Sequence, residues 1–286
     1  MLSTINYLLQ LLITFISVIC VSHSHLAGKI IDHDRTVVNC GKYKREANQH
    51  SCVLTPFNPE GPYFLPDDLH RSTINEQEKG KPLHLEINLV DANDCKPLEN
   101  MFIHIWHANA LGIYSGVDNN YKVPKYLKGL TIGGPGDSGM GPGVGRPKAI
   151  SNNRACRGYQ VTNSEGQVNF NTIIPGWYGA RCLHIHVEVF HGNTTELNNI
   201  IYVTQIYFHR DLPSKLLWSE PYFQNDHQIF LNDQDGIYLF HGNETTVDLL
   251  ETNGHYSTSI TFGINPKASK KDHQNLTSNS LKGKNI

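Results

Sequence analysis

The sequence carries no excess of charge of one sign, and charged side chains make up only 17% of its 286 residues. Its 24 Lys and Arg residues nearly balance 26 Asp and Glu residues, for a formal net charge of −2 at pH 7. A nucleic-acid-binding protein needs a basic patch to neutralise phosphates, so this balance argues against that class. The hydrophobic content of 39% is ordinary. It excludes a disordered or collagenous chain and allows a buried core.

Long hydrophobic runs are also scarce, with one exception near the start of the chain. Residues 7–21 are apolar, and Ser22 and Ser24 follow them where a signal peptidase prefers small residues. A membrane anchor is the alternative, but the run is short for a bilayer span. We therefore predict a signal peptide over residues 1–24 and a secreted, extracellular protein without membrane contact once the signal is removed.

Cysteine is sparse, and five cysteines follow the predicted signal peptide: Cys40, Cys52, Cys95, Cys156 and Cys182. In an oxidising compartment, two disulfides and one free thiol are the natural count. The spacing does not fix the connectivity; we expect Cys40–Cys52 as a local pair and Cys95–Cys156 as a second pair, with Cys182 left over. Secretion would also make candidate glycan sites of three sequons, which begin at Asn193, Asn243 and Asn275.

Helical periodicity is scarce, and short strands dominate the pattern. Residues 83–90 alternate apolar and polar side chains, which is typical of a half-buried strand. Six further short runs, separated by turn residues, are expected to be strands: 101–107, 167–170, 184–190, 200–208, 237–240 and 257–262. Such a series favours a β-sandwich or barrel. We predict an all-β, single-domain fold over residues 25–265, followed by a flexible polar tail over residues 266–286.

Glycine is concentrated in residues 129–145, and this segment lacks the Gly-Lys-Ser/Thr ending of a phosphate-binding loop. It also lacks the strand-to-helix setting of a dinucleotide site. We expect a long flexible loop that borders an active site.

The chemistry begins with His184 and His186 on a predicted strand. Side chains two residues apart on a strand point to one face, so both imidazoles can reach one metal ion. Alone, such a pair in a chain with 16 histidines favours a structural or surface role. Tyr178, just after a Pro-Gly turn, and Tyr114 change this interpretation. Two phenolates and two imidazoles form a hard, anionic donor set that suits Fe(III), and a metal ion allows tyrosine to bind as phenolate near neutral pH.

Two further features invite a metal or calcium assignment and are interpreted differently. His104 and His107 lie three residues apart, so on a strand they would point to opposite faces. We expect them in the core or close behind the metal ligands. Residues 233–236 place their glycine too early for a calcium-binding loop, so we expect a turn there.

Two strings carry a family resemblance: WHANALGIYSG at residues 106–116 and PGWYGARCLHIHV at residues 175–187. They resemble the two signatures of the intradiol ring-cleavage dioxygenases, Fe(III) enzymes that open catechols between their two hydroxyl groups. The resemblance runs from about residue 60 to residue 240, and the short interval between Tyr178 and His184 is most similar to the secreted eukaryotic branch. It implies a prealbumin-like β-sandwich whose long loops form the iron site.

The resemblance also implies a role for each matching residue. The side chains that would bind a non-haem Fe(III) are Tyr114, Tyr178, His184 and His186. Tyr178 would also be catalytic, because it would leave the metal when substrate binds. Arg181 would be the cation beside the substrate, Gln205 the amide that helps to position it, and residues 61–64 part of the pocket. The sequence shows no pattern for the helical dimerisation region of the bacterial catechol enzymes, which favours a monomer.

This interpretation predicts O2-dependent cleavage of a catechol to a cis,cis-muconate-type product, with degradation or detoxification of plant phenolics as its purpose. The substrate stays open among catechol, protocatechuate, hydroxyquinol and larger plant catechols. One alternative is a copper oxidase that uses His25 as a mature N-terminus, which leaves both tyrosine motifs unexplained. Another is a non-catalytic β-sandwich that binds phenolics or sugars. Pure protein that contains no iron although all four ligands are intact would favour this alternative. A zinc hydrolase is disfavoured because tyrosine is a poor zinc ligand.

Overall fold

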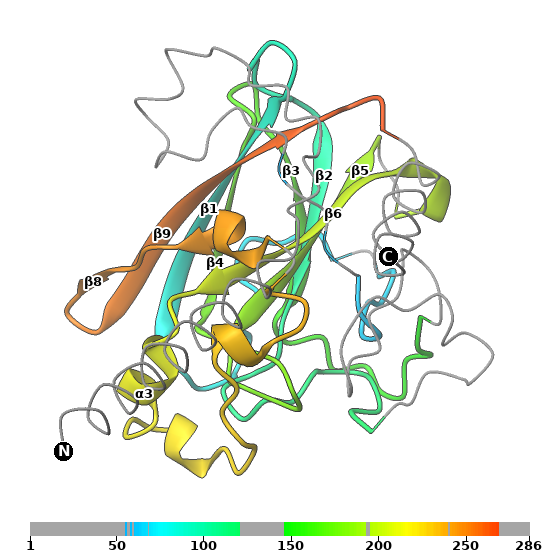
Figure 1. Ribbon diagram of the computed structural model, residues 1–286. Helices are drawn as coiled ribbons and strands as arrows, with labels where there is room; N and C mark the ends of the chain where they lie inside the picture. The colour runs from blue at the N-terminus through cyan, green and yellow to red at the C-terminus, as the bar shows by residue number, and fades with distance from the viewer. Residues whose placement is uncertain are drawn as a thin grey trace, which may run out of the picture. The chain divides into compact units, whose positions relative to one another are not determined.

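The computed structural model of the protein describes residues 55, 58, 60–67, 69–120, 146–192, 195–239 and 241–268. Within them, two β-sheets pack against each other (Figure 1). The first sheet has the strand order β4-β1-β9-β8 and contains β1 (Pro82–Asp91), β4 (Gln167–Ile173), β8 (Leu250–Thr252) and β9 (His255–Ile264). The second has the order β3-β2-β5-β6-β7 and contains β2 (Met101–Trp106), β3 (Arg157–Val161), β5 (His184–His191), β6 (Ile200–Phe208) and β7 (Thr246–Val247).

Helical segments within the described residues are few and short. They are η2 (Leu197–Asn199), α3 (Leu212–Leu216), η3 (Tyr222–Gln224), η4 (Asn232–Gln234) and η5 (Gly242–Thr245). The predicted all-β sandwich is therefore confirmed, and the two sheets do not close into a barrel in the described chain. No helix in the described ranges is long and apolar enough to cross a membrane.

The core lies between the two sheets. In β1, alternate side chains are buried, as the period-2 pattern predicts, and Leu85 and Ile87 have no exposed surface. They pack in one cluster with Ile105 of β2 and Ile185 and Val187 of β5. Burial of each such side chain contributes about 1.5–3 kcal/mol to folding.

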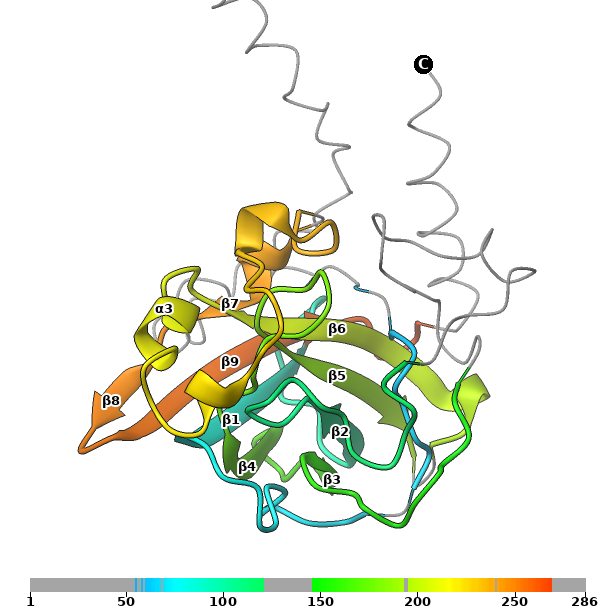
Figure 2. The ribbon, with the colours of Figure 1, turned by 90° about the horizontal axis from the view of Figure 1, so that it is seen from below.

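The three central strands of the second sheet, β2, β5 and β6, are buried on both faces, unlike β1, in which alternate residues are exposed or half-buried. Every residue of β2 and β6 is buried, and in β5 all but the last residue are. Antiparallel pairing places Trp106 of β2 opposite His186 of β5, and His186 opposite Gln205 of β6. These strands lie side by side in Figure 2. The polar side chains on this outer face are covered by loops, and they form the candidate site.

Two predictions about the fold are wrong. Residues 237–239 form a turn instead of a strand, because Asp235 Oδ1 accepts hydrogen bonds from the backbone N–H of Ile237 (2.8 Å) and of Tyr238 (3.3 Å). Cys95 is disulfide-bonded, whereas Cys156 is a free, buried thiol. The Cys95–Cys156 pair is therefore excluded. Cys182 is a free thiol, as expected.

Several predictions concern parts of the chain outside the described residues and stay predictions. They are the signal peptide over residues 1–24, His25 as a mature N-terminus, the Cys40–Cys52 pair, the whole glycine-rich segment 129–145, the sequons at Asn193 and Asn275, and most of the tail over residues 266–286. All described residues belong to one compact unit, Thr36–Ile286. Of the three sequon asparagines, the described Asn243 is exposed at the surface of η5.

Candidate metal centre

Four side-chain atoms from three separate segments form a closed ring. Tyr114 Oη lies 3.1 Å from Tyr178 Oη, which lies 3.1 Å from His184 Nε2. His184 Nε2 lies 3.1 Å from His186 Nε2, and His186 Nε2 lies 3.0 Å from Tyr114 Oη. The structure thus brings together all four residues that the sequence predicts as metal ligands, with their donor atoms facing one point.

Strand β5 sets the two imidazoles on the same face. The Nδ1 of His184 lies 2.7 Å from the carbonyl oxygen of Cys182, which fixes its proton on Nδ1 and leaves a lone pair on Nε2. The ring of His186 stacks on Trp106, with centroids 4.8 Å apart and an interplanar angle of 4°. Gly61 lies against the Cε1 edge of this ring, so closely that a Cβ there would lie 3.0 Å from His186 Cε1.

Two glycines allow the tyrosine-bearing segments to approach each other. A Cβ on Gly176 would lie 2.2 Å from the carbonyl oxygen of Ala110, and one on Gly112 would lie 2.3 Å from that of Trp177. Gly112 also has a φ of +77°, which favours glycine. Asn225 joins the segments, because its Nδ2 donates to the carbonyl oxygens of Ala110 (3.2 Å) and Trp177 (2.9 Å).

Burial disfavours charge on all four side chains. It raises the pKa of Tyr114 far above its usual range, and it does the same for Tyr178 with the help of nearby Tyr114. It lowers the pKa of His184 and His186 well below 6.5, an effect that Arg181 strengthens. The imidazoles are therefore neutral and ready to ligate, whereas the phenols ionise only beside a strong positive charge.

A metal ion fits this donor set in size and in chemistry. The centre of a ring with edges near 3 Å lies about 2 Å from each atom, the usual bond length from a metal ion to nitrogen or oxygen. Two phenol oxygens and two imidazole nitrogens suit a hard, highly charged cation such as Fe(III). Elsewhere in the described chain, no group of three or more His, Cys, Asp or Glu side chains could hold a metal ion.

Arg181 and Gln205 lie beside this ring, as the sequence predicts. Arg181 Nη2 donates to Gln205 Oε1, and the same oxygen accepts a hydrogen bond of 2.9 Å from Tyr207 Oη. Only 4% of Arg181 is exposed. A buried guanidinium held by several acceptors is a preorganised positive charge for an anion in the site.

Asp235 is the residue that the sequence did not reveal. Its Oδ2 accepts 2.9 Å from Arg181 Nε and 3.0 Å from the backbone N–H of Cys182. Burial opposes its ionisation, but Arg181 and the hydrogen bonds from Cys182 together outweigh this effect and hold the pKa of Asp235 below its ordinary value. Part of the turn predicted over residues 233–236 is the short helix η4, which ends at Gln234. The next residue, Asp235, holds Arg181 in place.

His104 and His107 are both fully buried and take no part in the ring. His107 Nε2 lies 2.7 Å from Thr172 Oγ1, and its Nδ1 lies 2.8 Å from the carbonyl oxygen of Ala108. Both nitrogens of His104 lack a hydrogen-bond partner among the described residues. Both histidines are core residues, as expected.

The predicted pocket segment, residues 61–64, lies against the centre. The Tyr63 ring is 4.6 Å from the Tyr114 ring and 6.3 Å from the Tyr178 ring, measured between centroids. The Tyr63 hydroxyl donates to the carbonyl oxygen of Asn119 (3.0 Å). Tyr63 therefore forms an aromatic wall next to both tyrosines.

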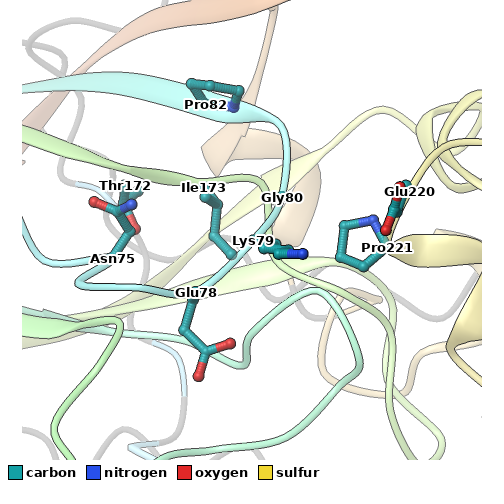
Figure 3. A pocket seen from close by; sticks show the side chains of 9 residues that line it. All are labelled: Asn75, Glu78, Lys79, Gly80, Pro82, Thr172, Ile173, Glu220 and Pro221. Carbon is teal, nitrogen blue, oxygen red and sulfur yellow. The ribbon is translucent and has the colours of Figure 1, made fainter.

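A separate cavity of about 360 Å³ lies at the ends of β1 and β4 (Figure 3). Its lining includes Glu78, Thr172, Ile173 and Pro221 and none of the predicted site residues. Glu78 Oε2 accepts a hydrogen bond from Asn109 (2.9 Å), so one wall of this cavity also anchors the segment that leads to Tyr114.

Two solved structures resemble this chain over most of its length. An intradiol ring-cleavage dioxygenase from Tetranychus urticae is 29% identical, with a TM-score of 0.63; the match covers 76% of this chain and 96% of that one. A second dioxygenase crystal structure is also 29% identical, with a TM-score of 0.64 and coverage of 77% and 97%. No protein-family model and no curated protein matches the sequence.

These likenesses give the class of the protein. The chain has the fold of the intradiol ring-cleavage dioxygenases, and the resemblance seen in the sequence is confirmed. Its neighbours support an oxygenase enzyme of this type.

Proposed function

We propose that this protein is a non-haem Fe(III) dioxygenase that cleaves catecholic aromatics between their two hydroxylated carbons. The single observation that supports it most is the ring of two phenol oxygens and two imidazole nitrogens with edges of 3.0–3.1 Å. Tyr114, Tyr178, His184 and His186 would hold the metal. When bound, Fe(III) would take both catechol oxygens and make the ring reactive toward O2.

The two tyrosines differ in ways that suit different tasks. Tyr114 is 1% exposed and lies in the aromatic cluster around Trp106. Tyr178 is only partly buried, and it precedes a tight turn at Gly179, where φ is +51°. We assign Tyr178 as the phenol that leaves when substrate binds, and its Oη would then hold one of the two catechol protons. Tyr114 would stay in place.

Arg181 would hold negative charge on the substrate. Its guanidinium has fixed partners in Asp235 and Gln205, so it needs no reorganisation when an anion enters. Replacing it would raise the barrier by about 3–4 kcal/mol if it acts like other preorganised donors. Tyr63 would pack against the aromatic ring of the substrate.

The product would be a cis,cis-muconate-type dicarboxylate that contains both oxygen atoms of O2. Secretion, expected from residues 1–24, would give the enzyme access to environmental or dietary phenolics. We further propose that the protein acts as a monomer, binds neither nucleic acid nor membrane, and degrades or detoxifies plant phenolics.

Incubation of iron-loaded protein with a panel of catechols under ¹⁸O2 tests the activity. We expect a ring-opened diacid with two labelled atoms, and loss of turnover in Arg181→Met but not in the exposed control Arg210→Met. The alternative copper oxidase, which would use His25 as its mature N-terminus, would release labelled water or peroxide instead. A folded, iron-loaded protein that consumes no O2 with any catechol would favour the phenolic-binding alternative.

A further inference from the structure

Residues Glu60–Leu65, which we call the strap, cross the outer face of the second sheet. The strap touches two residues of the ring, through Gly61 against His186 and through Tyr63 against Tyr114. Its position therefore sets the shape of the space beside the candidate metal centre.

Arg146 joins the strap to strand β5. Its guanidinium donates to Glu60 Oε1 from Nε (2.8 Å), and its Nη2 lies 2.6 Å from the same oxygen. The same Nη2 lies 3.3 Å from Glu188 Oε1 on β5. The guanidinium also lies over the Phe64 ring, 3.9 Å from its centroid. One cation thus contacts two residues of the strap, Glu60 and Phe64, and one residue of the sheet, Glu188.

These three polar side chains are almost fully out of water. Glu60 and Glu188 have no exposed surface, and the Arg146 side chain is 14% exposed. Apolar neighbours, among them Phe102 and Phe190, surround the strap. Desolvation makes a buried ion pair no more stabilising than well-packed apolar side chains. What the fork of a guanidinium adds is a fixed geometry between the groups that it joins.

The rest of the strap has other anchors. Arg157 Nη1 donates to the carbonyl oxygen of Tyr63 (2.6 Å), and the backbone N–H of Asn58, just before the strap, donates to Val203 (3.0 Å). Loosening the contact at Glu60 would therefore free the start of the strap without detaching all of it. The four ring residues lie on other segments and would keep their places.

We propose that Arg146, Glu60 and Glu188 form a latch that fixes the strap over the metal centre and thereby sets the affinity for substrate. These are positioning residues, since they act through Gly61 and Tyr63. The part that concerns substrate rests on the proposed dioxygenase function, whereas the part that concerns the strap does not.

Hydrogen–deuterium exchange of the full-length protein tests the strap directly. In Glu188→Leu, which removes both acceptor oxygens, and in Arg146→Met, we expect the peptide that covers residues 58–67 to exchange at least about tenfold faster, with β1 unchanged. Arg210→Met, which removes the exposed partner of Asp233 (3.5 Å), is the matched control and should leave the strap unchanged. If Arg146→Met does not fold, Arg146→Lys takes its place in the test, because lysine keeps the positive charge but lacks the branched guanidinium that joins Glu60 to Glu188.

Steady-state kinetics of the iron-loaded variants tests the effect on substrate. We expect KM to rise tenfold, which corresponds to about 1.4 kcal/mol of binding energy. We expect kcat to stay within about twofold of the wild-type value. Strap exchange identical to wild type in Glu188→Leu and in the arginine variant that folds would overturn the latch, whatever the enzyme's activity. Faster exchange with unchanged KM would overturn its role in affinity. A wild-type protein without turnover would instead count against the dioxygenase function.

Discussion

Arg181 and Asp235 form a buried ion pair, with 2.9 Å between Arg181 Nε and Asp235 Oδ2 and side chains only 5% and 1% exposed. The same carboxylate oxygen accepts the backbone N–H of Cys182. Asp235 therefore holds both the guanidinium and the backbone that leads into His184. The Arg181 guanidinium and the backbone before the first imidazole thus share one anchor, a residue that lies 54 positions after Arg181 in the chain.

Asp235→Asn keeps the side-chain shape but removes the charge that faces Arg181. Leaving one partner of a buried ion pair alone costs about 3–5 kcal/mol, so we expect a loss of that order in the free energy of unfolding. We also expect kcat to fall at least about tenfold. Asp233→Asn, at an exposed position two residues earlier, is the control. Denaturant unfolding and kinetics check both effects; equal stability and equal kcat in the two variants would contradict the assignment.

The same pair makes a prediction about acid. Because Arg181 holds the pKa of Asp235 below 3.8 in the folded protein, the unfolded state binds the proton more tightly. The stabilisation is then present above the unfolded pKa, near pH 4, and is lost as the pH falls through the lower folded pKa. The acid dependence of unfolding below pH 4 should be weaker in Asp235→Asn than in wild type. A steeper dependence would have the wrong sign.

Gly176→Ala should separate the two tyrosine segments. The added Cβ would lie 2.2 Å from a backbone oxygen, so one segment must move. We expect a stability loss of about 1–3 kcal/mol from overpacking and a lower iron content per chain. Gly192→Ala is the control, because nothing lies within 4 Å of its Cβ and only its positive φ adds a cost of about 1 kcal/mol. Metal analysis showing full iron occupancy in Gly176→Ala would refute this close approach as a requirement of the site.

His104 should make folding sensitive to mild acid. Burial, with the nearby cations Arg157 and Arg146, lowers the pKa of His104 to about 3. The unfolded state takes up a proton below its pKa of about 6.5 and the folded state does not, so stability falls as the pH drops from 7 toward 3. This amounts to about 2 kcal/mol at pH 5.

His104→Leu removes that titration and two buried nitrogens that lack partners in the described chain. We expect stability equal to or above wild type at pH 7, and a decrease between pH 7 and pH 5 that is smaller by about 2 kcal/mol. The control His209→Leu, at an exposed position, should keep the wild-type decrease. Thermal unfolding at the two pH values distinguishes these results. A variant as acid-sensitive as wild type would rule out His104 as the source.

Local sequence patterns were sufficient for the two histidines of the ring, but not for the two tyrosines, which lie on separate segments. His184 and His186 share a face by strand periodicity alone, whereas Tyr114 and Tyr178 were assigned from the chemistry of their donor atoms and from the family resemblance of their motifs. The strand pattern of β1 was equally readable, since one of its faces is in the core and the other is not.

Long-range polar contacts were not predictable in this way. The roles of Asp235 and Arg146 depend on partners 54 and 86 positions away, and no local pattern specifies them. Residues 237–239 form a short apolar run, which predicts a strand, yet Leu239 is 65% exposed and Asp235 caps the turn. The Cys95–Cys156 pair failed for the same reason, because spacing along the chain does not specify distance in space.

The visible absorption spectrum of the iron-loaded protein tests the four-donor centre most directly. We predict a tyrosinate-to-Fe(III) charge-transfer band that shifts when catechol is added without oxygen. Tyr178→Phe should keep a band from Tyr114 that shifts less with catechol, because no phenolate is left to depart. A folded protein that stays colourless and iron-free after reconstitution, or a band that is unchanged in both Tyr114→Phe and Tyr178→Phe, would contradict the assignment of these residues as metal ligands.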